Sequence, residues 1–343
     1  MESILLLAHT EPDGTLAKPA LEALAAALAL GGELSVGLVG ATVEPATNQI
    51  AGCGASRFLG VSGESFAQSR YGTDAAAGEA LCRASGAAIV IAPSTSRWAR
   101  ALPGVAYRLG GRVDTHVTSL AAVGGTPSVT RWFYRQRMEA VLSRAERPWM
   151  MLLDGGCVTP WSGPCGTAVV EAVAVEGPPI RTTVTGIQAP KADEQTIRPD
   201  AKLLFVEGAG WTKKQSDGAV HAAEAESLIL GFLRAAKASL GGSKSLVDLS
   251  GEGEAVLRCM THLNQIGQTG ATPRHPKGLS TCCHGEEPHV VGWRFVNQRR
   301  AINMDANCGW ARGKADVLYV ADAFEVMRLV NAKLEAKALV AQP

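Results

Sequence analysis

Two glycines in the second half of the chain follow an apolar run and could form a phosphate-binding turn. The run covers residues 202–206, and the turn after it contains Gly208 and Gly210. Backbone N–H groups at a strand-to-helix turn carry partial positive charge, which suits an anionic ligand. A tight turn without a ligand has the same pattern, so both interpretations stay open.

The loop at residues 265–270 places two hydrogen-bonding side chains between glycines. It reads Gln-Ile-Gly-Gln-Thr-Gly, so that Gln268 and Thr269 lie between Gly267 and Gly270. Such a loop can present its side chains to the polar edge of a bound ring, with the backbone close by. It can equally be a polar turn with only a structural role.

Residues 284–289 read His-Gly-Glu-Glu-Pro-His and also have two interpretations. Proline and glutamates are typical of the first turn of a helix. A zinc pair formed by the two histidines is the alternative, but no third or fourth ligand occurs at a recognisable spacing. We therefore predict no metal site. The chain also lacks a Gly-x-Ser-x-Gly elbow and a Walker loop, so we predict no catalytic residue.

Charge and cysteine content exclude further classes of protein. The 343 residues include 33 Lys+Arg and 32 Asp+Glu, so no strong field points to nucleic acid. There is no run of about 18 apolar residues and no secretory signal. Eight cysteines occur without a Cys-x-x-Cys pair. We therefore expect a cytoplasmic protein with reduced cysteines.

Four arginines recur around Trp98 and Tyr107; they are Arg97, Arg100, Arg108 and Arg112. Their spacing predicts a solvated helix face, with a basic interface as the alternative.

The apolar pattern predicts the fold class α/β, with two doubly wound domains. In the first half, strands at residues 4–8, 34–39 and 87–92 alternate with helices such as 19–30, which favours a parallel sheet covered on both faces. Shorter strands between residues 128 and 153 complete this domain. In the second half we predict strands at residues 202–206, 246–249, 279–282, 300–303 and 317–320, and helices at 216–237 and 324–339. Gly241 and Gly242 are expected to end the first of these helices.

Composition also suggests the domain boundaries. We place an N-terminal domain at residues 1–155, and a linker rich in Gly, Pro and Thr at 156–200. The linker contains an extended stretch near residues 169–175. The C-terminal domain then covers residues 201–343.

Several ordered segments together resemble the alpha subunit of electron-transfer flavoproteins, over nearly the whole chain. Residues 265–270 are similar to the family's Gln-Val-Gly-Gln-Thr-Gly flavin loop, and Gly285 and His289 fall on its Gly-x-x-x-His helix start. Residues 301–305 resemble its Ala-Ile-Asn-x-Asp segment, and residues 315–316 and 320–322 resemble its closing Ala-Asp and Val-x-Asp pieces. In the N-terminal half the similar segments are residues 4–8, 30–35 and 92–103.

The resemblance implies that the C-terminal domain is a Rossmann-like FAD-binding domain and that the N-terminal domain pairs with a beta subunit. It implies an electron carrier that accepts electrons from a flavin-dependent dehydrogenase and passes them towards a membrane quinone oxidoreductase. Thr269 would hydrogen-bond near flavin N5, and His289 would lie near the carbonyl O2. The implied cofactor-binding residues are Gly208, Gly210, Ser250, Gln265, Gly267, Gln268, Thr269, Gly270, Gly285, His289, Asn303 and Asp316.

This chain departs from the family's pattern in its charges. Ala209 and Gly251 stand where the family has arginines, while Glu286 and Glu287 add negative charge to the helix start beside the flavin. Because positive charge stabilises a reduced, anionic flavin, we predict that FAD binds with an altered potential or a lower affinity. A non-redox scaffold and an enzyme that binds NAD or ATP at the Gly208 turn are the alternatives.

Overall fold

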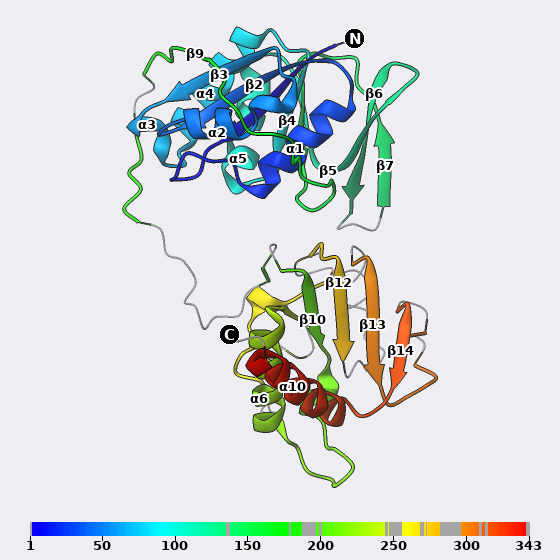
Figure 1. Ribbon diagram of the computed structural model, residues 1–343. Coiled ribbons are helices and arrows are strands. Elements are labelled where there is room, and N and C mark those ends of the chain that lie inside the picture. The colour runs from blue at the N-terminus through cyan, green and yellow to red at the C-terminus, as the bar shows by residue number, and fades with distance from the viewer. Residues whose placement is uncertain are drawn as a thin grey trace. The chain divides into compact units, whose positions relative to one another are not determined.

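The backbone of the computed structural model forms two β-sheets, one in each of two units of the chain (Figure 1). Unit 1 is Met1–Ile187 and unit 2 is Gln188–Pro343. The structure describes residues 2–134, 138–177, 180–186, 197–198, 201–243, 246, 256–267, 271, 273–281, 296–308, 311–312 and 315–340. The predicted α/β fold class is confirmed.

Unit 1 contains a sheet with the strand order β7-β6-β5-β8-β4-β1-β2-β3-β9. Its pairs are parallel, except that β6 runs antiparallel to both β5 and β7. The strands are β1 (Ser3–His9), β2 (Glu33–Gly40), β3 (Arg57–Ser62), β4 (Ile89–Pro93), β5 (Arg112–Val123), β6 (Thr126–Phe133), β7 (Met138–Leu142), β8 (Trp149–Leu153) and β9 (Val170–Ala172). The helices are α1 (Lys18–Ala29), α2 (Glu44–Gln49), the 3-10 helix η1 (Ala51–Cys53), α3 (Glu64–Ala67), α4 (Tyr71–Ser85) and α5 (Ser96–Arg108).

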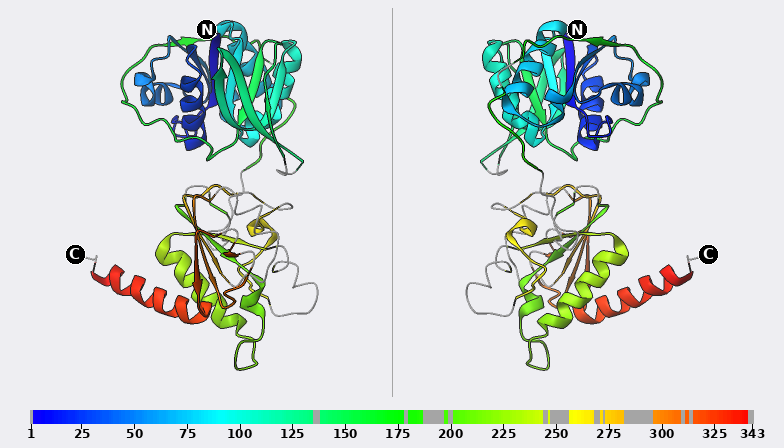
Figure 2. Two further views of the ribbon diagram at one scale, coloured as in Figure 1. Left: turned by 90° about the vertical axis from the view of Figure 1, so that its right-hand side faces the viewer. Right: turned by 90° about the vertical axis from the view of Figure 1, so that its left-hand side faces the viewer.

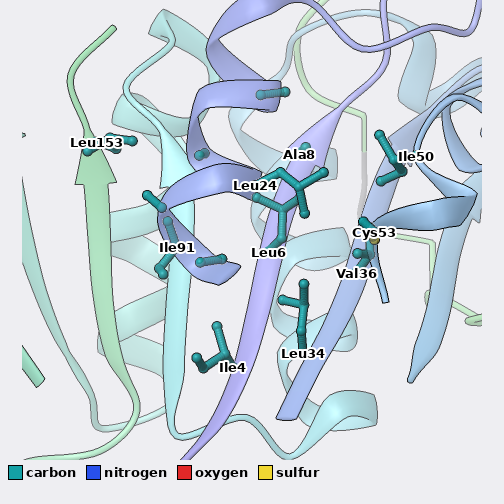
Figure 3. Close-up of a cluster of buried hydrophobic side chains, with 14 of the residues drawn as sticks. Ile4, Leu6, Ala8, Leu24, Leu34, Val36, Ile50, Cys53, Ile91 and Leu153 are labelled. Atoms are coloured by element: carbon teal, nitrogen blue, oxygen red, sulfur yellow. The ribbon is translucent and has the colours of Figure 1, made fainter. Parts of the chain in front are cut away.

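Helices cover both faces of this sheet because its central strands are apolar on both sides. Along β1, Ile4, Leu6 and Ala8 point to one face, where they pack with α1 and α2 (Figure 3). Leu5 and Leu7 point to the other face, where they pack with α4 and α5. This alternation follows from the two-residue period of a strand. The predicted strands at residues 4–8, 34–39 and 87–92 are confirmed by β1, β2 and β4.

In unit 1, two strands were not predicted, and two arginines lie elsewhere than on the predicted solvated helix face. The sequence pattern did not predict β3, whose apolar run is short, or β5, which carries polar residues such as Asp114. A solvated face is wrong for Arg97, because its side chain is buried on α5 and forms an ion pair of 2.7 Å with Asp74 of α4. Arg112 lies outside that helix, at the start of β5.

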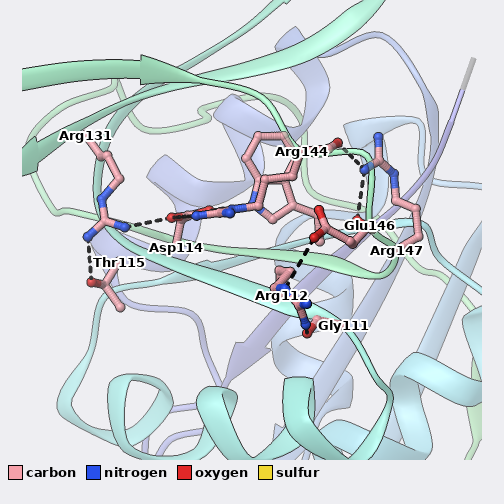
Figure 4. Close-up of polar contacts among 9 residues, drawn as sticks. Gly111, Arg112, Asp114, Thr115, Arg131, Arg144, Glu146 and Arg147 are labelled. Atoms are coloured by element: carbon pink, nitrogen blue, oxygen red, sulfur yellow. Dashed lines mark hydrogen bonds and ion pairs between the residues drawn. The ribbon is translucent and has the colours of Figure 1, made fainter.

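A buried carboxylate joins β5 to its neighbours (Figure 4). Asp114 accepts hydrogen bonds from Arg131 of β6 at 2.6 Å and from Arg144 at 2.5 and 2.9 Å. It also accepts one from the indole N–H of Trp149 on β8 at 2.8 Å. Burial acts to raise the pKa of Asp114, but these hydrogen bonds outweigh it, so the pKa lies below its ordinary value.

Unit 2 contains a parallel sheet with the order β11-β10-β12-β13-β14. Its described elements are β10 (Leu203–Glu207), the 3-10 helix η2 (Ala209–Thr212), α6 (Ala222–Ala236), β11 (Ser239–Gly242), the 3-10 helix η4 (His262–Asn264), β12 (Lys277–Thr281), β13 (Gln298–Asn303), β14 (Val317–Val320) and α10 (Ala323–Val340). Both α6 and α10 pack on the same side of the sheet (Figure 2), where they share one apolar cluster. Arg328 of α10 bonds Glu224 of α6 at 2.6 Å.

The predicted helix at residues 216–237 begins later than expected but ends where it was predicted. It starts at Ala222, and Lys237 ends it in the left-handed conformation at φ 50°. The expectation that Gly241 and Gly242 end this helix is wrong, because both glycines lie in β11. A Cβ on Gly242 would lie 2.1 Å from the methyl group at the flexible end of the Met260 side chain, which would have to move. Most of the strand predicted at residues 246–249 falls outside the described residues.

Candidate functional site

The strand order of unit 2 identifies the edge of its sheet where a ligand fits best. From β10 the chain moves to β11 on one side and then to β12 on the other side. In open α/β sheets, ligands bind at the carboxyl ends of the strands where the order reverses in this way. Here that point lies at the carboxyl ends of β10 and β12, marked by Glu207 and Thr281.

The turn after β10 is hydrogen-bonded to the end of β12. The backbone N–H of Gly208 donates to the carbonyl of Thr281 at 2.9 Å, and the indole of Trp211 donates to the Thr281 hydroxyl at 2.8 Å. Ala209 and Gly210 are buried in η2, a 3-10 helix of four residues. The long helix predicted from residue 216 begins only at Ala222, so the turn leads into η2 and not directly into α6.

Residues 265–267, the described part of the loop at residues 265–270, lie beside β11. The backbone N–H of Ile266 donates to the Gly242 carbonyl at 3.0 Å, and Gln265 is buried. Gly267 has a φ of 113°, a backbone conformation that residues with a Cβ rarely adopt. This glycine is therefore required by the shape of the loop.

Asn303 and Asp322 both lie at the carboxyl edge of the sheet, Asn303 at the end of β13 and Asp322 just after β14. They line a cavity of about 350 Å³ together with Gly210 and the exposed Lys213 and Lys214. The Asn303 side chain accepts from the backbone of Asp305 at 2.9 Å. The carboxylate of Asp322 accepts from the backbone N–H of Phe324 at 2.7 Å, at the start of α10. An amide, a carboxylate and two ammonium groups suit a ligand that carries phosphate and hydroxyl groups.

Asp316 does not lie with these residues. It precedes β14 at the opposite, amino edge of the sheet, where its carboxylate accepts from the Arg299 backbone at 2.6 Å and bonds the Arg299 guanidinium at 3.1 Å. Arg299 and Asn303 are four residues apart on one strand, which separates the two edges by roughly 13 Å. The strand predicted at residues 317–320 already placed Asp316 at its amino end, but the family resemblance assigned Asp316 to the cofactor.

Six of the proposed cofactor-binding residues lie outside the described residues. They are Ser250, Gln268, Thr269, Gly270, Gly285 and His289. The charge departures at Gly251, Glu286 and Glu287 also lie there. The described structure therefore brings Gly208, Gly210 and Asn303 to one edge, with Gln265 and Gly267 beside β11.

Glu207 places a buried carboxyl group at this edge. Its side chain is 0% exposed. Burial raises the pKa of Glu207 to about 8, and the nearby Glu226 adds to the effect. The carboxyl group is therefore mostly protonated and uncharged at neutral pH. Burial, together with Glu207, also raises the pKa of the neighbouring Cys259 thiol, so this thiol is not a nucleophile at neutral pH.

Comparison with known proteins gives the family. The sequence model of the electron transfer flavoprotein domain matches residues 4–179, just over half of the chain. The chain belongs to the electron transfer flavoprotein family. A search of curated proteins found no match. The family gives the coarse role of the chain, which is electron transfer that involves a flavin.

The match to the electron transfer flavoprotein domain lies within unit 1, and the cavity lies in unit 2. The three charged residues that line that cavity, Lys213, Lys214 and Asp322, were missing from the predicted cofactor set. Asp322 follows β14 just as Asn303 ends β13, so its position relative to a predicted strand was the signal that could have identified it. The two lysines follow the Gly208 turn closely in sequence.

The described residues contain no group of three or more His, Cys, Asp or Glu side chains placed to hold a metal ion. Among the same residues, no helix is long and apolar enough to cross a membrane.

Proposed function

We propose that this chain is the alpha subunit of a heterodimeric electron-transfer flavoprotein and that unit 2 binds FAD. It pairs with a beta subunit, accepts electrons from a flavin-dependent dehydrogenase and passes them towards a membrane quinone oxidoreductase. The observation that carries the proposal is the carboxyl edge of unit 2, where strand order, glycine turn and polar cavity coincide. The family match supports the electron-transfer role.

The residues of the cavity fit the phosphate and ribose half of FAD. Lys213 and Lys214 carry the positive charge that phosphate groups need, and each charge-assisted hydrogen bond contributes about 1.5–3 kcal/mol. The Asp322 carboxylate can accept a hydrogen bond from a ribose hydroxyl, and Asn303 can both donate and accept. When bound, FAD supplies the capacity to take up and release electrons.

The two lysines change the expected effect of Ala209. Ala209 stands where the family has an arginine and is buried in η2, so it offers no charge. Lys213 and Lys214 place positive charge at the phosphate end of the cavity instead. Burial keeps Glu207 largely uncharged, so it adds little negative charge. We therefore propose that the missing arginine alters the flavin potential more than it weakens the binding of FAD.

The test is the absorption spectrum of the chain purified together with a beta subunit. A carrier shows the visible bands of bound flavin, and a dehydrogenase with its substrate bleaches them. A stable complex without these bands would support the alternative function, a non-redox scaffold of a dehydrogenase complex. The observation that favours this alternative is the loss of the arginine at Ala209. If the flavin bands are present, a potentiometric titration compares the flavin potential of the wild-type complex with that of the Ala209→Arg complex.

A further inference from the structure

Unit 1 contains a second cavity, on the side of the sheet covered by α4 and α5. Its volume is about 700 Å³, within the usual range for sites of small organic molecules. The N-terminal turn of α4, one side of α5 and the segment at residues 180–184 line it. All these residues precede residue 187, so the cavity belongs to unit 1 alone.

Four arginines line this cavity: Arg70, Arg100, Arg108 and Arg181. No Asp or Glu side chain is among the described residues that line it. Within the described part of the chain, only Arg108 of the four contacts a carboxylate, that of Glu79 at 3.3 Å, which Arg83 also binds at 2.9 Å. Arg100 donates instead to the neutral hydroxyl of Ser69, and Arg70 to the Ser65 carbonyl. The cavity therefore has an excess of positive charge in a chain whose net charge is only +1.

The nearby buried carboxylate compensates only part of this charge. Asp74 is fully buried and forms its ion pair with Arg97, whose guanidinium also donates to the Phe66 carbonyl at 2.6 Å. Asp74 lies in the first turn of α4, where it also accepts from the backbone N–H of Arg70 at 3.1 Å. The positive charge available to a ligand therefore comes from the arginine side chains rather than from the helix start.

The walls of the cavity also contain apolar groups. The ring of Tyr71 is 45% exposed and Ile180 is 55% exposed, and both line the cavity. Guanidinium groups bind phosphate through two parallel hydrogen bonds. An apolar wall beside them suits the organic part of a phosphorylated molecule.

We propose that this cavity binds a small phosphorylated organic anion. Arg100 and Arg181 contact the phosphate, and Tyr71 and Ile180 contact the organic part. The site is independent of the flavin site proposed for unit 2, so the two proposals can fail separately.

The test is calorimetric titration of the full chain with phenyl phosphate and with benzoate at physiological ionic strength. Phenyl phosphate binds with a sub-millimolar dissociation constant, and benzoate binds more weakly because it carries less charge. Arg100→Gln and Arg181→Gln each weaken the binding of phenyl phosphate by about tenfold, since each removes a charge-assisted hydrogen bond. Both side chains are exposed, so neither variant removes buried contacts, and thermal unfolding checks that both fold.

Two control variants decide whether the binding is specific to this cavity. Arg83→Gln removes an arginine of α4 that does not line the cavity and leaves phenyl phosphate binding unchanged. Lys213→Gln combined with Lys214→Gln also leaves it unchanged. The proposal is wrong if phenyl phosphate does not bind, if Arg100→Gln and Arg181→Gln bind it normally, or if the lysine variant loses it. Binding of long acidic peptides alone, without phenyl phosphate, would identify a protein-docking surface and likewise overturn the proposal.

Discussion

At the scale of single residues, two buried carboxyl groups show how the surroundings set the charge. Asp114 accepts hydrogen bonds from two arginines and a tryptophan, which keep it ionised despite its burial. Glu207 is equally buried, but burial and the nearby Glu226 raise its pKa to about 8. The first group therefore stabilises the fold as an anion, and the second only as a neutral acid.

Glu207→Gln should remove a pH dependence of stability. The folded-state pKa of Glu207 lies above its ordinary value of 4.5, so the folded chain holds a proton that the unfolded chain releases. This contribution is fully present below pH 4.5 and is lost as the pH rises towards 8, by about 1.4 kcal/mol per pH unit. Urea unfolding followed by tryptophan fluorescence measures the slope, with Glu224→Gln, at a partly exposed ion pair with Arg328, as control. An unchanged slope in Glu207→Gln would rule out this role.

Asp114→Ala should destabilise unit 1 by about 3–5 kcal/mol, because it removes a fully buried carboxylate and leaves the partly buried Arg131 and Arg144 without this partner. The pKa of Asp114 is lowered, so the wild-type contribution is present above the ordinary value of 3.8 and is lost as the pH falls below it. Thermal unfolding at neutral and acid pH measures both effects. Glu146→Gln is the control, since its exposed pair with Arg112 at 3.5 Å contributes at most about 1 kcal/mol. Equal losses in the two variants would contradict the prediction.

Lys213→Gln combined with Lys214→Gln should weaken FAD binding at least about tenfold, through the loss of charge-assisted contacts to phosphate. Fluorescence titration of flavin-free protein with FAD measures the dissociation constant. Lys277→Gln removes one positive charge at the amino end of β12, away from the cavity, and should leave the affinity unaltered. If all variants bind FAD alike, the phosphate groups lie elsewhere.

The candidate site could be predicted only in part from the sequence. The glycine turn led to Gly208 and Gly210, and the family resemblance led to Asn303; the structure places all three at the carboxyl edge of the sheet of unit 2. The resemblance also led to Asp316, which lies at the other edge, because the short strand β14 separates it from Asp322. A resemblance of short segments does not show which of the two aspartates faces the cavity in this chain.

At the scale of secondary-structure elements, the local pattern predicted the strands that contain continuous apolar runs. Residues 4–8 and 203–206 are such runs, and both lie in interior strands of their sheets. Two of the strands missed, β3 and β5, are also interior strands but depend on distant partners. Gly60 of β3 leaves room for Val170 of β9, and Asp114 of β5 depends on arginines about 17 and 30 residues away.

Packing of α4 on α5 gives a prediction at this scale. A Cβ on Gly78 would lie 3.1 Å from the Cγ2 atom of Val105 and 3.4 Å from the ring of Trp98. Gly78→Val should therefore overpack this contact and cost about 1–3 kcal/mol. Gly72→Ala lies in the same helix where nothing is within 4 Å and should not destabilise it. Thermal unfolding compares them, and a Gly78→Val variant as stable as Gly72→Ala would contradict the packing argument.

At the scale of the whole molecule, the chain after residue 155 still contributes to unit 1. Trp161 donates its backbone N–H to the Leu21 carbonyl at 3.1 Å, and β9 pairs with β3. Without β9, the hydrogen-bonding groups of β3 would form a free sheet edge.

A fragment of residues 1–187 should therefore be more stable than one of residues 1–155. The expected difference is about 2–3 kcal/mol, from the lost burial of Trp161 and Val170. Urea unfolding and light scattering of the two fragments measure stability and self-association. Equal stability would place the domain boundary near residue 155 rather than at residue 187.

The arginine-lined cavity includes Ile180, Arg181 and Val184, only a few residues before unit 2 begins. A ligand that contacts Arg181 and Arg100 would therefore hold residues 180–184 against α5. Such a ligand would slow proteolysis and amide hydrogen exchange of residues 180–184 without a change in the fold of unit 1.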